Sequence, residues 1–233
     1  MNAIITGATK GIGKAITEAF AAEGFHLALC SRSQADLEAY RDDLRSRYPQ
    51  QEVLIKATDM REKEQVLAFA DFIKGQWQEV EVLVNNAGIF LPGAVSEEAD
   101  GLLEQQIETN LYSAYHLTRA ILPIMLPQKR GYIFNMCSIA SFMAYPNGGS
   151  YSISKFALLG FSKVLRAELL DKGIRVSAIM PGGTWSNSWA GVDLPEDRLM
   201  KAEDIAIAVM AAYKMSPSAV VEEIILRPQL GDL

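Results

Sequence analysis

Near its start the chain reads Asn2-Ala3-Ile4-Ile5-Thr6-Gly7-Ala8-Thr9-Lys10-Gly11-Ile12-Gly13, a short apolar run that leads into a turn with three glycines. The apolar run predicts a buried strand, and the helical spacing of apolar residues from Ala15 to Phe20 predicts a helix after the glycines. Glycines tolerate positive φ and let the backbone approach a pyrophosphate, while a helix N-terminus offers free N–H groups. Strand, glycine turn and helix in this order form the context that a dinucleotide site requires.

The rest of the chain continues this alternation of apolar runs and helical patterns. Strict alternation implies right-handed crossovers and a parallel sheet covered by helices on both faces. Ligands of such sheets bind at the carboxyl ends of the strands. The sequence therefore predicts one α/β domain over residues 1–233, a Rossmann-type doubly wound parallel sheet of seven strands. Further strands are expected at 25–30, 52–57, 80–84, 132–136, 174–180 and 219–226, and further helices at about 33–47, 61–78, 97–126, 150–170 and 201–215.

Composition argues against several classes of partner. The 233 residues are 49% hydrophobic and 21% charged, with a formal net charge of −6. An acidic chain of this kind argues against nucleic acid or an anionic membrane as the main partner. No apolar stretch reaches the ~18 residues that would span a membrane. The two histidines, His26 and His116, lie outside any ligand motif, so no metal site is expected.

Cysteine usage bears on the compartment. Cys30 and Cys137 both lie in apolar runs, and the sequence has neither a Cys-x-x-Cys motif nor a secretory leader. Isolated cysteines in this setting are expected to be buried thiols rather than a disulfide framework. We therefore expect a cytoplasmic protein.

A second stretch, Tyr151-Ser152-Ile153-Ser154-Lys155, carries candidate chemistry. In a helix its four-residue spacing puts Tyr151 and Lys155 on one face. An ammonium about 4 Å from a phenol favours the phenolate by roughly 4 kcal/mol at an effective dielectric near 20, which lowers the tyrosine pKa by about three units. Tyr151 would then donate a proton near neutral pH, and the hydroxyl of Ser138 would bind the oxygen that receives it. Taken alone, this pattern is usually an ordinary solvated helix pair, so its weight depends on the other motifs of the chain.

Two cations near the glycine turn bear on the choice of cofactor. Arg32 begins a helix, where a cation opposes the helix dipole unless an anion lies beside it. The strand-end positions at which an NAD enzyme carries an acid hold Cys30 and Ser31. Lys10 supplies a second cation within the turn itself. We favour a ribose 2′-phosphate as the partner of Lys10 and Arg32 over two solvated cations.

Polar residues after two other strands allow two interpretations each. Asp59 either caps the helix at 61–78 or contacts an adenine. Asn85 and Asn86 either form a turn or lock adjacent strands by side-chain hydrogen bonds and wall a ligand cleft. These alternatives stay open on sequence evidence.

The motifs together resemble the short-chain dehydrogenase/reductase family over essentially the whole chain. Thr6–Gly13 is similar to its cofactor turn, Asn85–Gly88 to its central motif, and Pro181-Gly182 to its nicotinamide-side loop. The family's catalytic tetrad falls on Asn110, Ser138, Tyr151 and Lys155.

The resemblance implies the strand order 3-2-1-4-5-6-7, an NADP(H) cofactor, and hydride transfer between nicotinamide and a carbonyl carbon. It implies that Tyr151 donates the proton, that Ser138 orients the substrate oxygen, and that Lys155 lowers the tyrosine pKa and binds the nicotinamide ribose. It further implies that Asn110 holds a water linking Lys155 to solvent, and that a homotetramer or dimer is built on the helices of Asn110 and Tyr151. The residues expected at the cofactor are Gly7, Thr9, Lys10, Gly11, Ile12, Gly13, Arg32, Asp59, Met60, Asn86, Ala87, Gly88, Tyr151, Lys155, Pro181, Gly182 and Thr184.

Within the family the chain is most similar to the bacterial 3-oxoacyl-acyl-carrier-protein reductase type. This likeness implies NADPH-dependent reduction of a ketone or 3-oxoacyl thioester in fatty acid biosynthesis, with acyl carrier protein as a candidate partner. Small-carbonyl, 3-hydroxy-acid and sepiapterin-type reductases stay open, as does a protein that senses NADP without catalysis. A sugar-nucleotide epimerase or dehydratase is disfavoured by the glycine spacing at 7, 11 and 13.

The substrate side is described least well by the sequence. Residues 183–200 are expected to form a lid that is short for the family, which predicts a shallow or open pocket. Lys129, Arg130 and Lys172 are candidates to meet an acidic carrier, unless they only serve helix C-termini. Ordinary core or lid packing is the favoured interpretation for each of the following residues, and lining the pocket is the alternative: Ile89, Phe90, Phe142, Met143, Trp185 and Trp189.

Overall fold

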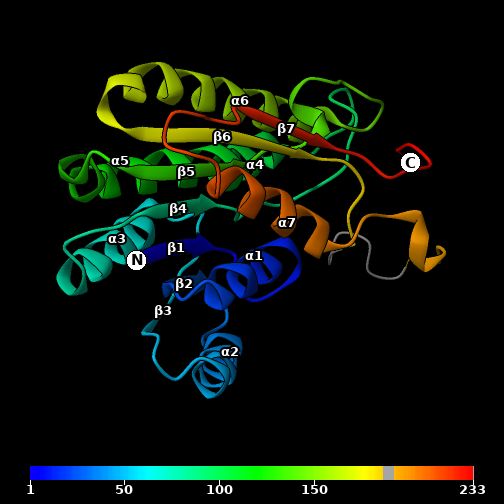
Figure 1. Ribbon diagram of the computed structural model, residues 1–233. Helices are drawn as coiled ribbons and strands as arrows, with labels where there is room; N and C mark the ends of the chain where they lie inside the picture. The colour runs from blue at the N-terminus through cyan, green and yellow to red at the C-terminus, as the bar shows by residue number, and fades with distance from the viewer. Residues whose placement is uncertain (186–191, 233) are drawn as a thin grey trace.

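The computed structural model describes residues 1–185 and 192–232, and these form a sheet with helices on both faces (Figure 1). Within them seven strands pair in parallel in the order β3-β2-β1-β4-β5-β6-β7, which confirms the predicted topology. The strands are β1 (Asn2–Thr6), β2 (His26–Ser31), β3 (Val53–Ala57), β4 (Val82–Asn85), β5 (Gly131–Met136), β6 (Ile174–Pro181) and β7 (Glu223–Leu226).

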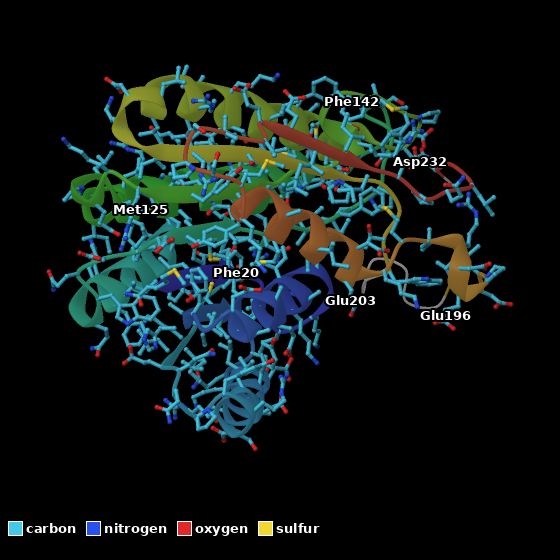
Figure 2. All side chains as sticks on the ribbon, in the orientation of Figure 1. Phe20, Met125, Phe142, Glu196, Glu203 and Asp232 are labelled. Carbon is cyan, nitrogen blue, oxygen red and sulfur yellow. The ribbon has the colours of Figure 1, made fainter. Side chains whose placement is uncertain are left out.

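The helices divide into two layers because the central strands bury side chains on both faces. On β1, Ile5 packs in a cluster with α1, α2 and α7, whereas its neighbour Ile4 packs in a cluster with α3, α5 and α6. Phe20 of α1, labelled in Figure 2, meets the ring of Tyr213 of α7 edge to face at 5.7 Å. The helices are α1 (Gly11–Ala22), α2 (Gln34–Arg47), α3 (Lys63–Gln76), α4 (Leu102–Ile107), α5 (Ser113–Met125), α6 (Gly149–Leu169) and α7 (Ala202–Tyr213).

The predicted helix at 97–126 differs most from the structure. It begins only at Leu102, because Gly101 before it has a left-handed backbone with φ +87°. Residues Glu108–Tyr112 then form a π-helical turn around Asn110, and such turns often occur at functional sites. After this turn α5 runs to Met125, with Pro123 inside the helix.

A smaller correction concerns the last strand, whereas the cysteines are as predicted. The strand predicted at 219–226 is reduced to β7, which pairs with β6 only from Ala178 to Pro181. Cys30 and Cys137 are buried free thiols, as expected. No helix in the described ranges is both long enough and apolar enough to cross a membrane.

One edge of the sheet collects the segments of interest. The strands run in the same direction, so their carboxyl ends lie together at the right of Figure 1, beside the C-terminal tail. The glycine turn follows β1 there, Asn86 follows β4, Ser138 follows β5, and Gly182 follows β6. The topology alone therefore brings these separate motifs to one place.

Candidate active site

A cavity of about 560 Å³ opens at this edge of the sheet. Three of the four expected catalytic side chains, Ser138, Tyr151 and Lys155, lie in its wall. The other described residues that line it are Ile12, Asn86, Gly88, Ile89, Phe90, Met136, Cys137, Ile139, Met143, Tyr145, Pro146, Pro181, Gly182, Gly183, Thr184, Val192 and Asp232.

Tyr151 lies in the first turn of α6 and is held from two sides. The ring of Phe90 meets its ring edge to face, with 4.8 Å between the centroids. Ser138 lies beside the phenol, and its own position is fixed because its hydroxyl accepts a hydrogen bond of 3.1 Å from the backbone N–H of Ala140. The phenol and the serine hydroxyl thus share one wall of the cavity.

Lys155 is buried, at 4% exposure, one helical turn after Tyr151. Its Nζ donates a hydrogen bond of 2.8 Å to the carbonyl oxygen of Met136 and lies 5.8 Å from the centroid of the Tyr151 ring. A Cβ added to Gly88 would lie 3.5 Å from this Nζ, so the central motif also touches the lysine. Burial lowers the pKa of Lys155 to about 8, because the charged form loses its hydration.

The predicted lowering of the Tyr151 pKa is wrong for this arrangement. Burial raises the pKa of Tyr151 to about 12, and the Ser138 side chain opposes the rise only in part. The prediction treated the phenol and ammonium as a pair in a polar medium, whereas desolvation dominates here and the lysine is turned toward Met136. At neutral pH the phenol of Tyr151 consequently carries its proton, which is the state that a proton donor needs.

Asn110 lies behind the cavity wall and holds the segment that follows β4. Its Oδ1 accepts from the backbone N–H of Ile89 at 2.8 Å, and its Nδ2 donates to the carbonyl oxygen of Ile89 at 3.0 Å. The same Nδ2 donates to Ser154 Oγ on α6 at 2.9 Å. Asn110 thus joins the segment with Phe90 to the helix with Tyr151, while its role toward a water stays a prediction.

Asn85 and Asn86 lock neighbouring strands, which confirms the second interpretation of this pair. Asn85 Nδ2 donates to Asn135 Oδ1 on β5 at 2.8 Å, within the sheet. Asn86 Nδ2 donates to the carbonyl oxygen of Thr6 on β1 at 2.8 Å, and Asn86 also lines the cavity. The two asparagines therefore tie β4 to both of its neighbours.

The glycine turn fits a dinucleotide pyrophosphate. Gly7 and Gly11 have φ of +65° and +53°, which side chains with a Cβ rarely adopt. A Cβ added at Gly13 would lie 2.2 Å from the carbonyl oxygen of Gly7, so only glycine permits this close approach. The first turn of α1 has neither a capping side chain nor an acidic residue, which leaves its N–H groups available to an anion.

The residues expected at the adenosine end are partly engaged with one another. Lys10 Nζ lies 3.2 Å from Asp36 Oδ2, and the side chains are 63% and 42% exposed, so a phosphate could displace this weak pair. Arg32 is also exposed. Asp59 accepts at 3.0 Å from the backbone N–H of Arg61 and forms an ion pair with its guanidinium, which lowers the pKa of the carboxyl. It closes a turn before α3 rather than capping that helix, whose N-cap is Glu62.

Met60 is placed differently from the other expected cofactor residues. Its side chain is 6% exposed and packs in the core, with its Sδ 3.7 Å from Cys30 Sγ. Only its backbone can therefore face a ligand. Ile12 is the one residue of the glycine turn among those that line the cavity, together with Pro181, Gly182 and Thr184. The cavity wall does not include the other expected residues of the turn, such as Thr9 and Gly13, or Ala87.

The substrate side needs the most correction. Ile89, Phe90 and Met143 line the cavity, although packing was the favoured interpretation for each of them. Phe142 and Trp185 do not line it, and Trp189 lies outside the described residues. The indole of Trp185 instead donates to the carbonyl oxygen of Glu196 at 2.7 Å. Tyr145 and Pro146 were missed, although they adjoin a turn that the sequence marks.

The C-terminal tail supplies a wall that the sequence did not predict. Asp232 lines the cavity and lies at the same end of the molecule as Phe142 (Figure 2). One of its carboxylate oxygens pairs with Arg227 at 2.7 Å, and the other is buried without a hydrogen-bond partner among the described residues. No local sequence pattern marks a carboxylate so far along the chain as part of the site.

The three cations that were candidates to bind a carrier protein lie at the edge of the sheet opposite the cavity. Lys129 and Arg130 precede β5 and Lys172 precedes β6, so all three lie at the amino ends of the strands, opposite the cavity. Lys172 Nζ donates to the carbonyl oxygen of Glu168 at 2.8 Å, which is the helix C-terminal role that was the alternative.

Comparison with known proteins gives consistent matches. The family model described as short chain dehydrogenase matches residues 1–196. A sepiapterin reductase of Chlorobaculum tepidum is 34% identical, covering 99% of this chain and 97% of that reductase. A 3-oxoacyl-[acyl-carrier-protein] reductase of Escherichia coli is 32% identical over 89% of this chain and 87% of its own length. The structure of an alcohol dehydrogenase from Thermococcus sibiricus complexed with 5-hydroxy-NADP superposes with a TM-score of 0.90 at 29% identity, covering 98% of this chain and 96% of that one.

The depressed pKa of Lys155 predicts a pH-dependent stability. Between pH 8 and 10.5, the lowered and the ordinary value, the unfolded chain binds more protons than the folded chain, so stability rises with pH there. Below pH 8 the penalty for burying the ammonium is constant. Lys155→Met should remove this rise, which we expect to be on the order of 3 kcal/mol.

Urea denaturation of both proteins from pH 7 to pH 10 measures the effect. Lys172→Met, at an exposed lysine, controls for the loss of a charge. Stability curves that stay parallel for wild type and Lys155→Met would contradict the prediction.

Proposed function

The chain belongs to the short chain dehydrogenase family and is an NADP-dependent oxidoreductase acting on CH–OH groups, and from this premise we propose that it works as an NADPH-dependent carbonyl reductase. The observation that carries the proposal is the placement of Ser138, Tyr151 and Lys155 around one cavity. The loop from Pro181 to Thr184 forms another part of the same wall. The proposed proton donor and the proposed cofactor-binding loop therefore line the same cavity.

In this proposal each side chain has a defined task. Bound NADPH supplies the hydride that reduces the carbonyl carbon. Tyr151 donates its phenolic proton to the carbonyl oxygen, and Ser138 donates a hydrogen bond to that same oxygen and orients it. Lys155, charged below pH 8, stabilises the phenolate that remains after transfer.

The cofactor is held in the proposal by three groups of residues. The N–H groups at the start of α1 bind the pyrophosphate, and Lys10 and Arg32 bind the 2′-phosphate. The absence of an acid at the end of β2, where Cys30 and Ser31 stand, supports this preference. At the nicotinamide end the proposal assigns binding to Asn86, Gly88, Gly182 and Thr184.

We propose a main substrate class and a second candidate class. A ketone or a 3-oxoacyl thioester is our main proposal, supported by the likeness to 3-oxoacyl-[acyl-carrier-protein] reductases, and it places the protein in fatty acid biosynthesis. A pterin is the second candidate, because the likeness to a sepiapterin reductase extends over nearly both whole chains. Asp232 favours this second class, since a carboxylate in the cavity wall suits a substrate with N–H donors.

Two further features complete the proposal. We infer a homo-oligomer built on α5 and α6, because apolar side chains such as Phe156 and Val164 are 45% and 55% exposed on α6. The two buried thiols support a cytoplasmic location.

Tyr151→Phe tests the proton donor. Removing the hydroxyl eliminates the only group assigned to protonate the oxygen, so kcat should fall at least 100-fold, the lower range of general-acid contributions. The packing against Phe90 does not need the hydroxyl, so NADPH binding, measured by fluorescence titration, should stay within about twofold of wild type. Turnover of a ketone equal to that of wild type would reject Tyr151 as the acid.

Arg32→Ala tests the cofactor preference. The loss of a charge-assisted contact to the 2′-phosphate should weaken NADPH binding about 10- to 100-fold. NADH lacks that phosphate, so its dissociation constant should hardly change. Arg41→Ala, at an arginine of α2 paired with Asp42, is the matched control. Equal dissociation constants of NADPH and NADH in the wild type would remove the assignment.

A substrate screen separates the two classes. We expect NADPH oxidation, followed by absorbance, with an acetoacetyl thioester or a diketone as the main outcome. Turnover of sepiapterin that is lost selectively in Asp232→Asn would establish the second class instead. NADPH binding without oxidation across the panel would reject a reductase altogether.

A further inference from the structure

Glu98 is distant in the sequence from Tyr151, yet its side chain contacts the beginning of α6, the helix that carries Tyr151. Its Oε1 accepts a hydrogen bond of 2.8 Å from the backbone N–H of Ser150, and its Oε2 accepts from the hydroxyl of the same serine. Ser150 is 1% exposed and immediately precedes Tyr151. The carboxylate therefore reaches the turn that presents the phenol.

The helix needs this contact because it has no cap of its own. The N-cap of α6 is Gly148, which offers no side chain, and its first turn contains no acidic residue. The first N–H groups of a helix have no partner within the helix, and a buried one must find a partner elsewhere. Glu98 meets that need for Ser150, and its negative charge suits the positive end of the helix dipole.

Two glycines make room for the carboxylate. A Cβ added at Gly149 would lie 2.1 Å from Glu98 Oε1, and one added at Gly93 would lie 2.6 Å from Glu98 Cγ. The backbone N–H of Gly93 also donates to the carbonyl oxygen of Asn147 at 3.0 Å, on the loop before α6. Glu98 is thus packed in a shaped recess rather than extended along the surface.

The segment that carries Glu98 also contacts the phenol itself. Phe90 on this segment packs edge to face on the Tyr151 ring. Between Phe90 and Glu98 the segment is fixed by Gln106, which is fully buried and exchanges hydrogen bonds with both backbone groups of Leu91. Tyr151 is consequently held through its ring by Phe90 and through its backbone neighbour by Glu98.

We propose that Glu98 is a positioning residue, which sets the angle at which α6 presents Tyr151 to the cavity by capping Ser150. The proposal rests on the assignment of Tyr151 as proton donor. It predicts that loss of the cap changes the chemical step more than it changes cofactor binding, because Lys155 stays anchored on Met136 independently of Glu98.

Three variants test the proposal. Glu98→Ala removes both hydrogen bonds and should lower kcat about 10- to 100-fold, since a misplacement of about 1 Å has such an effect. Glu98→Gln keeps the shape and can still bond both groups of Ser150, so it should retain most of the kcat. Glu97→Ala is the matched control, because Glu97 is the exposed neighbour whose side chain has no hydrogen bond or ion pair in the described residues.

Two readouts separate positioning from general stability. The dissociation constant of NADPH should stay within about twofold of wild type in all three variants, so that the loss falls on kcat. Hydrogen exchange of the amides of residues 150–153, measured without cofactor or substrate, should accelerate about tenfold in Glu98→Ala and stay near wild type in Glu97→Ala.

The outcomes are distinguishable from those of the proposed function. Faster exchange at 150–153 with no carbonyl turnover even in the wild type would support the cap and reject the reductase. Unchanged exchange in Glu98→Ala, a kcat within twofold of wild type, or an equal loss in Glu97→Ala would overturn the positioning role. If Glu98→Ala fails to fold, a Glu98→Gln protein with normal stability and kcat supports the proposal, and failure of both variants to fold overturns it.

Discussion

At the carboxyl edge of the sheet, the backbone groups near and beyond the strand ends still need hydrogen-bond partners. Side-chain amides supply these partners. Asn86 bonds the end of β1, Asn110 bonds both backbone groups of Ile89, and Gln106 does the same for Leu91. An amide is suited to this task because it donates and accepts at once. The irregular segment after β4 is therefore held nearly as firmly as a strand, and the cavity keeps its shape without regular secondary structure on that side.

Burial then decides the protonation states within the cavity. The phenol of Tyr151 and the ammonium of Lys155 are both removed from water, which favours the neutral form of each. The tyrosine consequently holds its proton at neutral pH, whereas the lysine titrates near the physiological range. In the proposed reduction this gives a tyrosine that begins protonated, and a lysine that, while charged, stabilises the phenolate left after proton transfer.

The sequence predicts what depends on local pattern and fails where distant segments meet. Apolar runs and glycines placed every strand in order, and the motifs identified Ser138, Tyr151 and Lys155 as neighbours. The pKa of Tyr151 could not be predicted, because the lysine direction and the depth of burial depend on the assembled fold. Which of the pocket candidates face the cavity could not be predicted either, because position in the sequence does not say which way a ring such as that of Phe142 points. The position of Lys172 near the end of a helix likewise did not show whether this lysine lies at the cavity edge of the sheet or at the opposite edge.

The C-terminal tail adds a wall to the cavity on the side of the loop that follows β6. Arg198, next to the lid segment, donates to the carbonyl oxygen of Gly231 at 2.8 Å, and Gly182 donates to that of Leu226 at 2.7 Å. A Cβ on Gly182 would lie 2.4 Å from Asp232 Oδ1, so the tail lies directly on the loop that follows β6. Arg227 holds one oxygen of this carboxylate at 2.7 Å, while the other oxygen is buried against Gly182 without a hydrogen-bond partner among the described residues. The tail therefore contributes a fixed carboxylate to the cavity wall, and Asp232 bounds the cavity together with the loops that follow the strands.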